Sequence, residues 1–102
     1  MQKIYEYMTK ISKNGIVYYI SAPKIDAELV LVKIYIDNTQ LGVFIRRLAR
    51  LGNRNRKIVT LPHRFNKIWK ILHGRTVKVE LEPLENPTIE SVVKKIVMSL
   101  RD

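Results

Sequence analysis

Apolar and polar residues alternate along most of the first 82 positions, which is the pattern of half-buried β-strands. The alternation predicts six strands, at residues 3–11, 16–21, 29–37, 43–51, 56–61 and 76–82. Lys13-Asn14-Gly15 predicts a hairpin turn between the first two strands, because Asn and Gly tolerate a positive φ. Residues 38–42 are predicted to form a loop, and the alternation slips at Arg46-Arg47, which indicates a bulge.

Two further segments follow a period of 3.6 residues and predict short amphipathic helices. The apolar stripe of the first helix consists of Phe65, Ile68, Trp69 and Leu72. Gly74 suits the left-handed position that ends such a helix. After an acidic connector at residues 82–85, Asn86-Pro87 starts the second helix, since a capping residue is followed by proline. The apolar face of this second helix is formed by Ile89, Val92, Val93, Ile96, Val97 and Leu100.

The two halves of the β-rich region share an order of features. Ile20-Ser21-Ala22-Pro23 corresponds to Val59-Thr60-Leu61-Pro62, and Val32-Lys33-Ile34-Tyr35 corresponds to Val77-Lys78-Val79-Glu80. The second half is longer where the first predicted helix lies. Units repeated at this length generally cannot bury their apolar faces alone. We therefore expect one double β domain at residues 1–85, with repeats at 3–37 and 43–82, followed by a C-terminal helix at 86–102.

Positive charge is concentrated in one segment of the chain. Residues 38–79 contain eleven of the 19 Lys and Arg residues and none of the nine Asp and Glu residues. The remainder holds eight bases and nine acids, so the formal net charge of +10 arises within this segment. Surfaces built for stability and solubility mix both signs. An acid-free segment of this length therefore predicts a surface that binds a polyanion, with nucleic acid the leading one.

The densest part of this segment is residues 46–57, RRLARLGNRNRK, where six bases surround a Gly-Asn turn. Arginine binds phosphate and guanine edges through two parallel hydrogen bonds. The predicted nucleic-acid contacts are Arg46, Arg47, Arg50, Asn53, Arg54, Arg56 and Lys57. Asn53 and its neighbour Asn55 can either read adenine or serve the turn backbone. Six to eight phosphate contacts would make the affinity fall steeply with salt.

Residues 46–81 resemble the AbrB/MazE/SpoVT swapped-hairpin superfamily. The resemblance rests on the basic hairpin, the strand end at residues 59–62, the short helix, His73-Gly74 and the following Val-Lys-Val-Glu strand. It implies a mostly β fold with short helices, a swapped-hairpin barrel made of two fused copies of which the first is degenerate. It also implies that hairpin bases face duplex DNA, as in transcription regulators, antitoxins and chromatin-like proteins of this family.

Carried over by position, the resemblance adds Lys10 and Lys13 of the first copy to the predicted DNA contacts. Two copies in one chain imply that a monomer can complete the barrel that two chains normally make. The sequence also departs from the family pattern. Arg75 follows Gly74 where an acidic residue is common, and the first copy has no glycine at the matching place.

The sequence gives little support for disulfides, metal binding or catalysis. The chain has no cysteine, so disulfides and cysteine metal sites are excluded. His63 and His73 lack acids at ligand spacing, and no nucleophile, phosphate loop or catalytic set is recognisable. We expect no enzyme activity, no cofactor and no metal. No apolar run reaches 18 residues, so the expectation is no membrane association and a cytoplasmic, nucleoid-associated location.

Two alternative functions remain open from the sequence. A basic chain of this size is also typical of RNA-binding and ribonucleoprotein components. The other alternative is a protein-interaction subunit, antitoxin-like, that uses the C-terminal helix to hold a protein partner or a second copy. The residues predicted for that contact are Ile89, Val93, Ile96, Val97 and Leu100.

Overall fold

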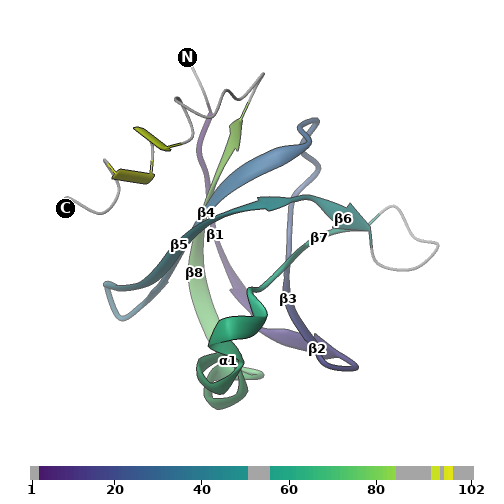
Figure 1. Ribbon diagram of the computed structural model, residues 1–102, viewed down its shortest axis with the longest axis vertical. Helices are drawn as coiled ribbons and strands as arrows, with labels where there is room; N and C mark the ends of the chain where they lie inside the picture. Colours follow the sequence, from purple (N-terminus) through teal and green to yellow (C-terminus); the bar gives the residue numbers. More distant parts are fainter. Residues whose placement is uncertain (1–2, 51–55, 85–92, 95, 98–102) are drawn as a thin grey trace.

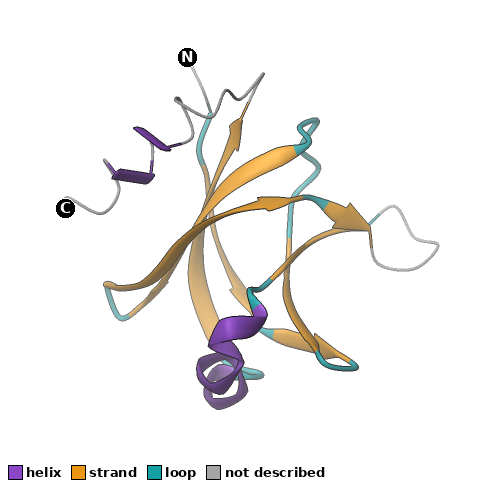
Figure 2. Ribbon diagram, viewed as in Figure 1, coloured by secondary structure: helices purple, strands orange, loops and turns teal. Residues whose placement is uncertain are grey.

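The described chain forms two four-stranded antiparallel sheets (Figure 1, Figure 2). The computed structural model describes residues 3–50, 56–84, 93–94 and 96–97. In the first sheet the strands are ordered β1 (Tyr5–Lys10), β8 (Thr76–Leu84), β4 (Leu29–Ile36) and β5 (Thr39–Arg47). In the second sheet the order is β2 (Ser12–Asn14), β3 (Val17–Ser21), β7 (Lys57–Thr60) and β6 (Ala49–Arg50). The prediction of a mostly β fold is confirmed.

Two long strands connect the sheets. Only Ile11 separates β1 from β2, and only Leu48 separates β5 from β6, so each of these strands leaves one sheet and enters the other. The hydrogen bonds of the described strands thus form two sheets, and no closed barrel is present among them.

The strand pairs of the two halves follow the same scheme. Hairpin β2–β3 in the first half matches hairpin β6–β7 in the second, and the hairpins join through β3 and β7. The last strands of the halves, β4 and β8, pair with each other, and each also pairs with the first strand of the opposite half. Neither half therefore completes a sheet without the other.

The core lies between the inner faces of the two sheets. Alternate residues of β4 and β8, namely Val30, Val32, Ile34, Val77, Val79 and Leu81, are at most 1% exposed. Ile20 of β3 and Val59 of β7 face them from the second sheet and are fully buried. This matches the period of two expected for strands with one buried face.

The prediction of a loop at residues 38–42 is wrong. Ile36 pairs directly with Thr39, so β4 and β5 are joined by the two-residue turn Asp37-Asn38. Both turn residues have a positive φ, 48° and 67°, as the hairpin turn that matches the strand twist requires. Asp and Asn adopt this conformation more readily than other non-glycine residues.

The strand irregularities differ from the predicted ones. The register shifts between Ile34 and Tyr35 of β4, whereas β5 continues regularly through the two arginines and is interrupted at Leu48. Strand β8 extends to Leu84, through the segment that was expected to be a connector. Pro83 fits there because β1 pairs with β8 only as far as Leu81, so the end of β8 has a free edge.

The predicted helix exists, but its apolar stripe is only half buried. A 3₁₀ turn, His63–Phe65, precedes α1 (Asn66–Leu72). Trp69 and Leu72 are buried, whereas Phe65 and Ile68 are 37% and 41% exposed. The 3₁₀ turn advances by three residues per turn, so Phe65 leaves the phase of the helix. A seven-residue helix then buries the single strip formed by Trp69 and Leu72.

Helix α1 lies beside the start of β8, near β2 (Figure 1). Trp69 Nε1 donates a hydrogen bond of 3.0 Å to the Pro62 carbonyl. Gly74, at a φ of 80°, turns the chain after α1, and its backbone N–H donates to the Ile11 carbonyl at 2.9 Å. Ile11 in turn forms a bridge to His73. Hairpin β2–β3 and helix α1 therefore lie next to each other.

The predicted C-terminal helix falls mostly outside the described residues, including Ile89 and Leu100. The four described positions, residues 93–94 and 96–97, are helical. Val93 and Val97 are 52% and 44% exposed.

Candidate nucleic-acid interface

The predicted arginine hairpin is built from the end of β5, strand β6 and strand β7. We call this the basic arm, and its described bases are Arg46, Arg47, Arg50, Arg56 and Lys57. Arg50 pairs across the hairpin with Lys57. The turn of the hairpin, with Asn53 and Arg54, lies outside the described residues. The five described bases therefore lie along one hairpin: Arg46 and Arg47 end β5 of the first sheet, and Arg50, Arg56 and Lys57 lie on or directly beside β6 and β7 of the second sheet.

Arg46 is bound within the protein. Its Nε donates to the Thr60 carbonyl at 2.8 Å, and its Nη2 donates to Thr60 Oγ1 at 2.5 Å. The side chain is half-buried. Because Thr60 ends β7, this fork ties β5 to β7 at the base of the arm. A guanidinium hydrogen bond to protein acceptors of this kind stabilises the fold.

Arg47 is exposed and pairs with an acid that is distant in sequence. Its Nη2 lies 3.2 Å from Glu28 Oε1, and both side chains are more than 70% exposed. The ion pair is weak because water screens it, so the Arg47 guanidinium can exchange Glu28 for a phosphate. Although residues 38–79 contain no acid, the fold thus brings Glu28 next to one of their arginines.

The segment between β3 and β4 contacts the other end of the arm. Arg56 Nη2 donates to Ser21 Oγ at 2.5 Å, and Lys57 Nζ donates to the Ile25 carbonyl. Backbone bonds from Ala22 N to Lys57 O and from Leu48 N to Glu28 O, both 3.0 Å, add to this contact. Residues 21–28 therefore hold the arm at this end, in addition to the contact of Arg46 with Thr60.

An open depression of about 280 Å³ lies between this segment and the arm. Its lining residues are Lys24, Ile25, Asp26, Arg50 and Lys57. Three of them are basic and one is acidic, so the depression attracts anions. Lys24 was not among the predicted contacts, because the sequence places it far from the arginine run.

Lys10 and Lys13 lie on the first-half strands and are exposed. Lys13 Nζ lies over the Tyr18 ring, 5.4 Å from its centroid. Strand β2 is at the opposite edge of the second sheet from β6. Three strand spacings of about 4.8 Å separate these edges, and Lys13 and Arg50 are also about four residues apart along the strands, which places Lys13 roughly 20 Å from Arg50 of the basic arm. The fold does not bring these lysines into the same cluster as the arginines.

The acids of the first sheet face away from the core on β1 and β8. Glu6, Glu80 and Glu82 occupy outward positions there, and Lys78 Nζ lies 2.8 Å from Glu6 Oε1. The hydrogen bond to Glu6 raises the pKa of Lys78. The strands of the second sheet and α1 contain bases and no acid, whereas the first sheet carries these three acids together with Lys10, Lys33, Lys78 and the two arginines that end β5. Positive charge is therefore neutralised less on the second sheet and α1 than on the first sheet.

The described residues contain no group of three side chains suited to a metal ion. His73 packs edge-on against Tyr18, with ring centroids 5.9 Å apart, and His63 Nδ1 lies 3.4 Å from Asn66 Nδ2. Both histidines thus have neighbours within the protein. Within the same residues no helix has the length and apolar character needed to cross a membrane.

Comparison of the chain with protein-family models, curated proteins and solved structures finds no match. The likeness of residues 46–81 to a swapped-hairpin family therefore rests on the sequence motifs alone.

Proposed function

We propose that this protein binds nucleic acid, duplex DNA in the first place, through the basic arm. The observation that carries the proposal is the position of Arg47, Arg50 and Arg56. All three are exposed: Arg47 ends β5, Arg50 ends the edge strand β6, and Arg56 directly precedes β7, which pairs with β6. Along this hairpin a phosphate backbone can reach them together. Arginine at such an edge contacts phosphates bidentately and supplies the salt-dependent part of the affinity.

Within this proposal the bases of the arm have different roles. Arg46 positions β5 against β7 through Thr60, while Arg47, Arg50 and Arg56 contact the nucleic acid. Lys57 has its ammonium on the Ile25 carbonyl, so it holds residues 21–28 beside the arm and adds positive potential. Asn53 and Arg54 lie outside the described residues, and we propose from the sequence that they take part in the same contact.

The related strand pairing of the two halves supports a swapped-hairpin fold with two copies in one chain. Each hairpin is completed by strands of the other half, as the resemblance implies for two chains. We propose that the protein functions as a DNA-binding regulator or a chromatin-like factor and that one chain is sufficient for binding.

The test is fluorescence anisotropy with a labelled 16-base-pair duplex at several salt concentrations. The double variant Arg50→Ala/Arg56→Ala removes two phosphate contacts and should reduce the slope of log K against log salt by about 1.8. Across a fourfold rise in salt, the variant then loses about 12-fold less affinity than the wild type does. Lys3→Ala/Lys94→Ala is the matched control, since it removes the same charge from exposed positions away from the arm.

Equal slopes for the two double variants would refute the arm as the contact site. Competition between the duplex and a structured RNA hairpin separates DNA from RNA: tighter binding to RNA would favour a ribonucleoprotein component.

A second candidate function is association through the C-terminal helix. Val93 and Val97 are apolar, helical and about half exposed, which suits a contact with a protein partner or a second copy. Truncation after residue 85 should then lower the mass measured by light scattering or abolish partner capture, and should leave duplex binding intact.

A further inference from the structure

A second basic site lies between hairpin β2–β3 and helix α1. It is an open hollow of about 260 Å³. Its lining residues are Lys13, Ile16, Tyr18, Asn66, Lys67 and Lys70. The lysines come from strand β2 and helix α1, which are more than 50 residues apart in sequence and meet because Ile11 bonds to the chain just after α1. We call this site the lysine hollow.

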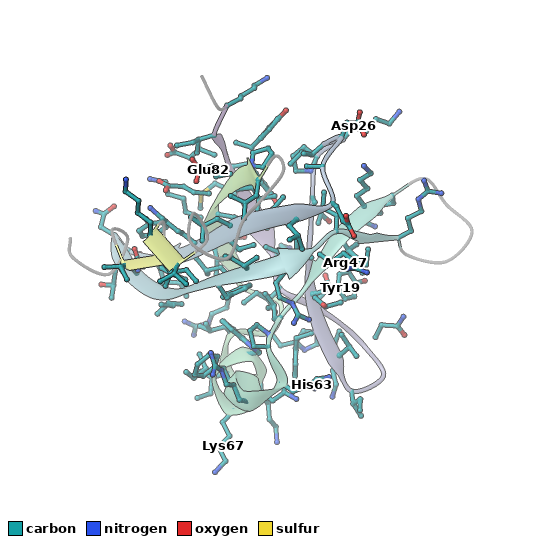
Figure 3. All side chains as sticks on the ribbon, turned by 45° about the horizontal axis from the view of Figure 1, so that its top comes forward. Tyr19, Asp26, Arg47, His63, Lys67 and Glu82 are labelled. Carbon is teal, nitrogen blue, oxygen red and sulfur yellow. The ribbon has the colours of Figure 1, made fainter. Side chains whose placement is uncertain are left out.

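The lysine hollow has no acid in its lining. No ion pair joins Lys13, Lys67 or Lys70 to an acid of residues 3–50 or 56–84. Lys67 and Lys70 are three positions apart on one helix, where like charges repel each other. Figure 3 shows Lys67 extending from α1 away from the sheets. The site thus gathers positive charge that the protein itself does not neutralise.

The hollow also has an apolar wall. Ile16, at the turn of hairpin β2–β3, is 76% exposed, so its side chain is accessible to a ligand in the hollow. Tyr18, which also lines the hollow, is buried, and the Lys13 ammonium lies over its ring. Lysine ammonium groups bind phosphate as point charges, and an exposed isoleucine can pack against a sugar or the edge of a base.

We propose that the lysine hollow binds a phosphate group of a nucleotide, with Ile16 against the neighbouring sugar or base. The proposal rests on the proposed nucleic-acid binding for its preferred ligand, but it uses residues outside the basic arm. Lys13 and Arg50 are on opposite edges of the second sheet and about four residues apart along its strands, which separates them by roughly 20 Å from strand spacing and rise. Successive phosphates of one strand are about 3.4 Å apart along the duplex axis, so a duplex of 16 base pairs is long enough to contact both sites.

The first experiment is the same salt-dependent anisotropy on the full chain with Lys67→Ala/Lys70→Ala. We expect the slope of log K against log salt to fall by about 1.8 and the salt-induced loss of affinity between 50 and 200 mM to shrink by about 12-fold. Lys3→Ala/Lys94→Ala again removes two charges outside the hollow. Its slope should differ from the wild-type slope by less than about 0.9, the value for one phosphate contact. Circular dichroism of each variant checks that it is folded.

The outcomes separate this site from the arm. If Lys67→Ala/Lys70→Ala behaves like the control while Arg50→Ala/Arg56→Ala flattens the slope, the lysine hollow is refuted and the proposed function stands. If only the lysine variant flattens the slope, the arm assignment fails and the hollow stands. Ile16→Ala should weaken binding without changing the slope, because it removes an apolar contact and no charge; an unchanged affinity would overturn the role of Ile16.

A second experiment identifies the source of the phosphate. Proton–nitrogen NMR spectra of the labelled protein are recorded during titration with the duplex and, separately, with inorganic pyrophosphate. Shifts at the amides of Ile16, Lys67 and Lys70 with the duplex alone assign the hollow to the nucleic-acid backbone. The same shifts with pyrophosphate assign it to free phosphate compounds. Spectra unchanged at these amides in both titrations would overturn the site.

Discussion

Replacement of Arg46 by alanine should weaken the fold more than the binding of nucleic acid. The change removes two hydrogen bonds from a half-buried guanidinium to Thr60, of 2.8 and 2.5 Å. Hydrogen bonds to charged groups contribute about 1.5–3 kcal/mol when buried. Because Arg46 is partly in contact with water, we take about 2 kcal/mol for the pair together. For a domain of this size, that corresponds to a decrease of roughly 10 °C in Tm.

Arg47→Ala is the matched control on the adjacent residue. Its ion pair with Glu28 joins side chains that are more than 70% exposed, and such pairs contribute little, typically about 0.5 kcal/mol. We expect Arg47→Ala to change Tm by less than about 3 °C and to reduce the salt slope of duplex binding by about 0.9. Arg46→Lys, which keeps the charge but loses the planar fork, should melt between Arg46→Ala and the wild type.

Thermal unfolding followed by circular dichroism, together with anisotropy below the melting range, measures both effects. The interpretation of Arg46 as a positioning residue is refuted if Arg46→Ala melts within the range of the control but binds the duplex with a reduced slope. In that case its guanidinium leaves Thr60 to contact phosphate.

Three further changes test the packing. Trp69→Phe should cost roughly 2 kcal/mol in urea unfolding. It leaves a smaller ring in a buried site and removes the 3.0 Å hydrogen bond to the Pro62 carbonyl, which keeps the Phe65 N–H at 3.2 Å; an unchanged midpoint would contradict this. Burial raises the pKa of Tyr7 above its usual 10.0. The stability that the neutral phenol contributes is therefore complete below pH 10 and decreases as the pH rises further, by up to about 1.4 kcal/mol per pH unit. Parallel curves of unfolding free energy against pH for Tyr7→Phe and the wild type between pH 9 and 11 would refute this. Leu72→Ala should cost about 2–4 kcal/mol and Ile71→Ala less than about 0.5, since Leu72 is buried and Ile71 is 74% exposed; equal costs in chemical unfolding would contradict the orientation of α1.

The strands were predictable from the sequence because their residues alternate with a period of two. The turn after β2 was predictable as well, since Gly15 has the positive φ of 63° that Asn-Gly sequences favour. The turn at Asp37-Asn38 was missed because neither residue is glycine. Polar residues on both sides of that turn gave the appearance of a loop, although β5 already begins at Thr39.

The phase of α1 could not be predicted from apolar spacing alone. A period of 3.6 residues places Phe65 and Ile68 on the same stripe as Trp69 and Leu72, but the 3₁₀ turn before the helix changes the phase at Phe65. Phe65 instead meets Trp69 edge-on, with ring centroids 6.4 Å apart. Periodicity identifies a helix with some buried residues, whereas the choice among the candidates depends on what the short helix packs against.

The arginine run was visible in the sequence, but the partners of its side chains were not. Thr60, Ser21 and Glu28 are 14, 35 and 19 positions from the arginines that they contact. Contacts of this range depend on how β3 pairs with β7 and on where residues 21–28 pass. The lysine hollow was not predictable for the same reason. Lys13 and the two helix lysines belong to different halves of the chain.

The joining of the hairpins through β3 and β7 decides how the positive charge is distributed. It sets Lys13 and Arg50 at opposite edges of one sheet, while outward-facing Glu6, Glu80 and Glu82 occupy the other sheet. Under the proposed function, a field with its positive end on the second sheet and α1 would orient the protein as it approaches a polyanion and raise the association rate at low salt. Bases at two edges would then engage phosphates that a single hairpin could not reach together. On this argument the pairing of the two halves contributes to binding as well as to folding, because it creates a basic surface wider than either hairpin.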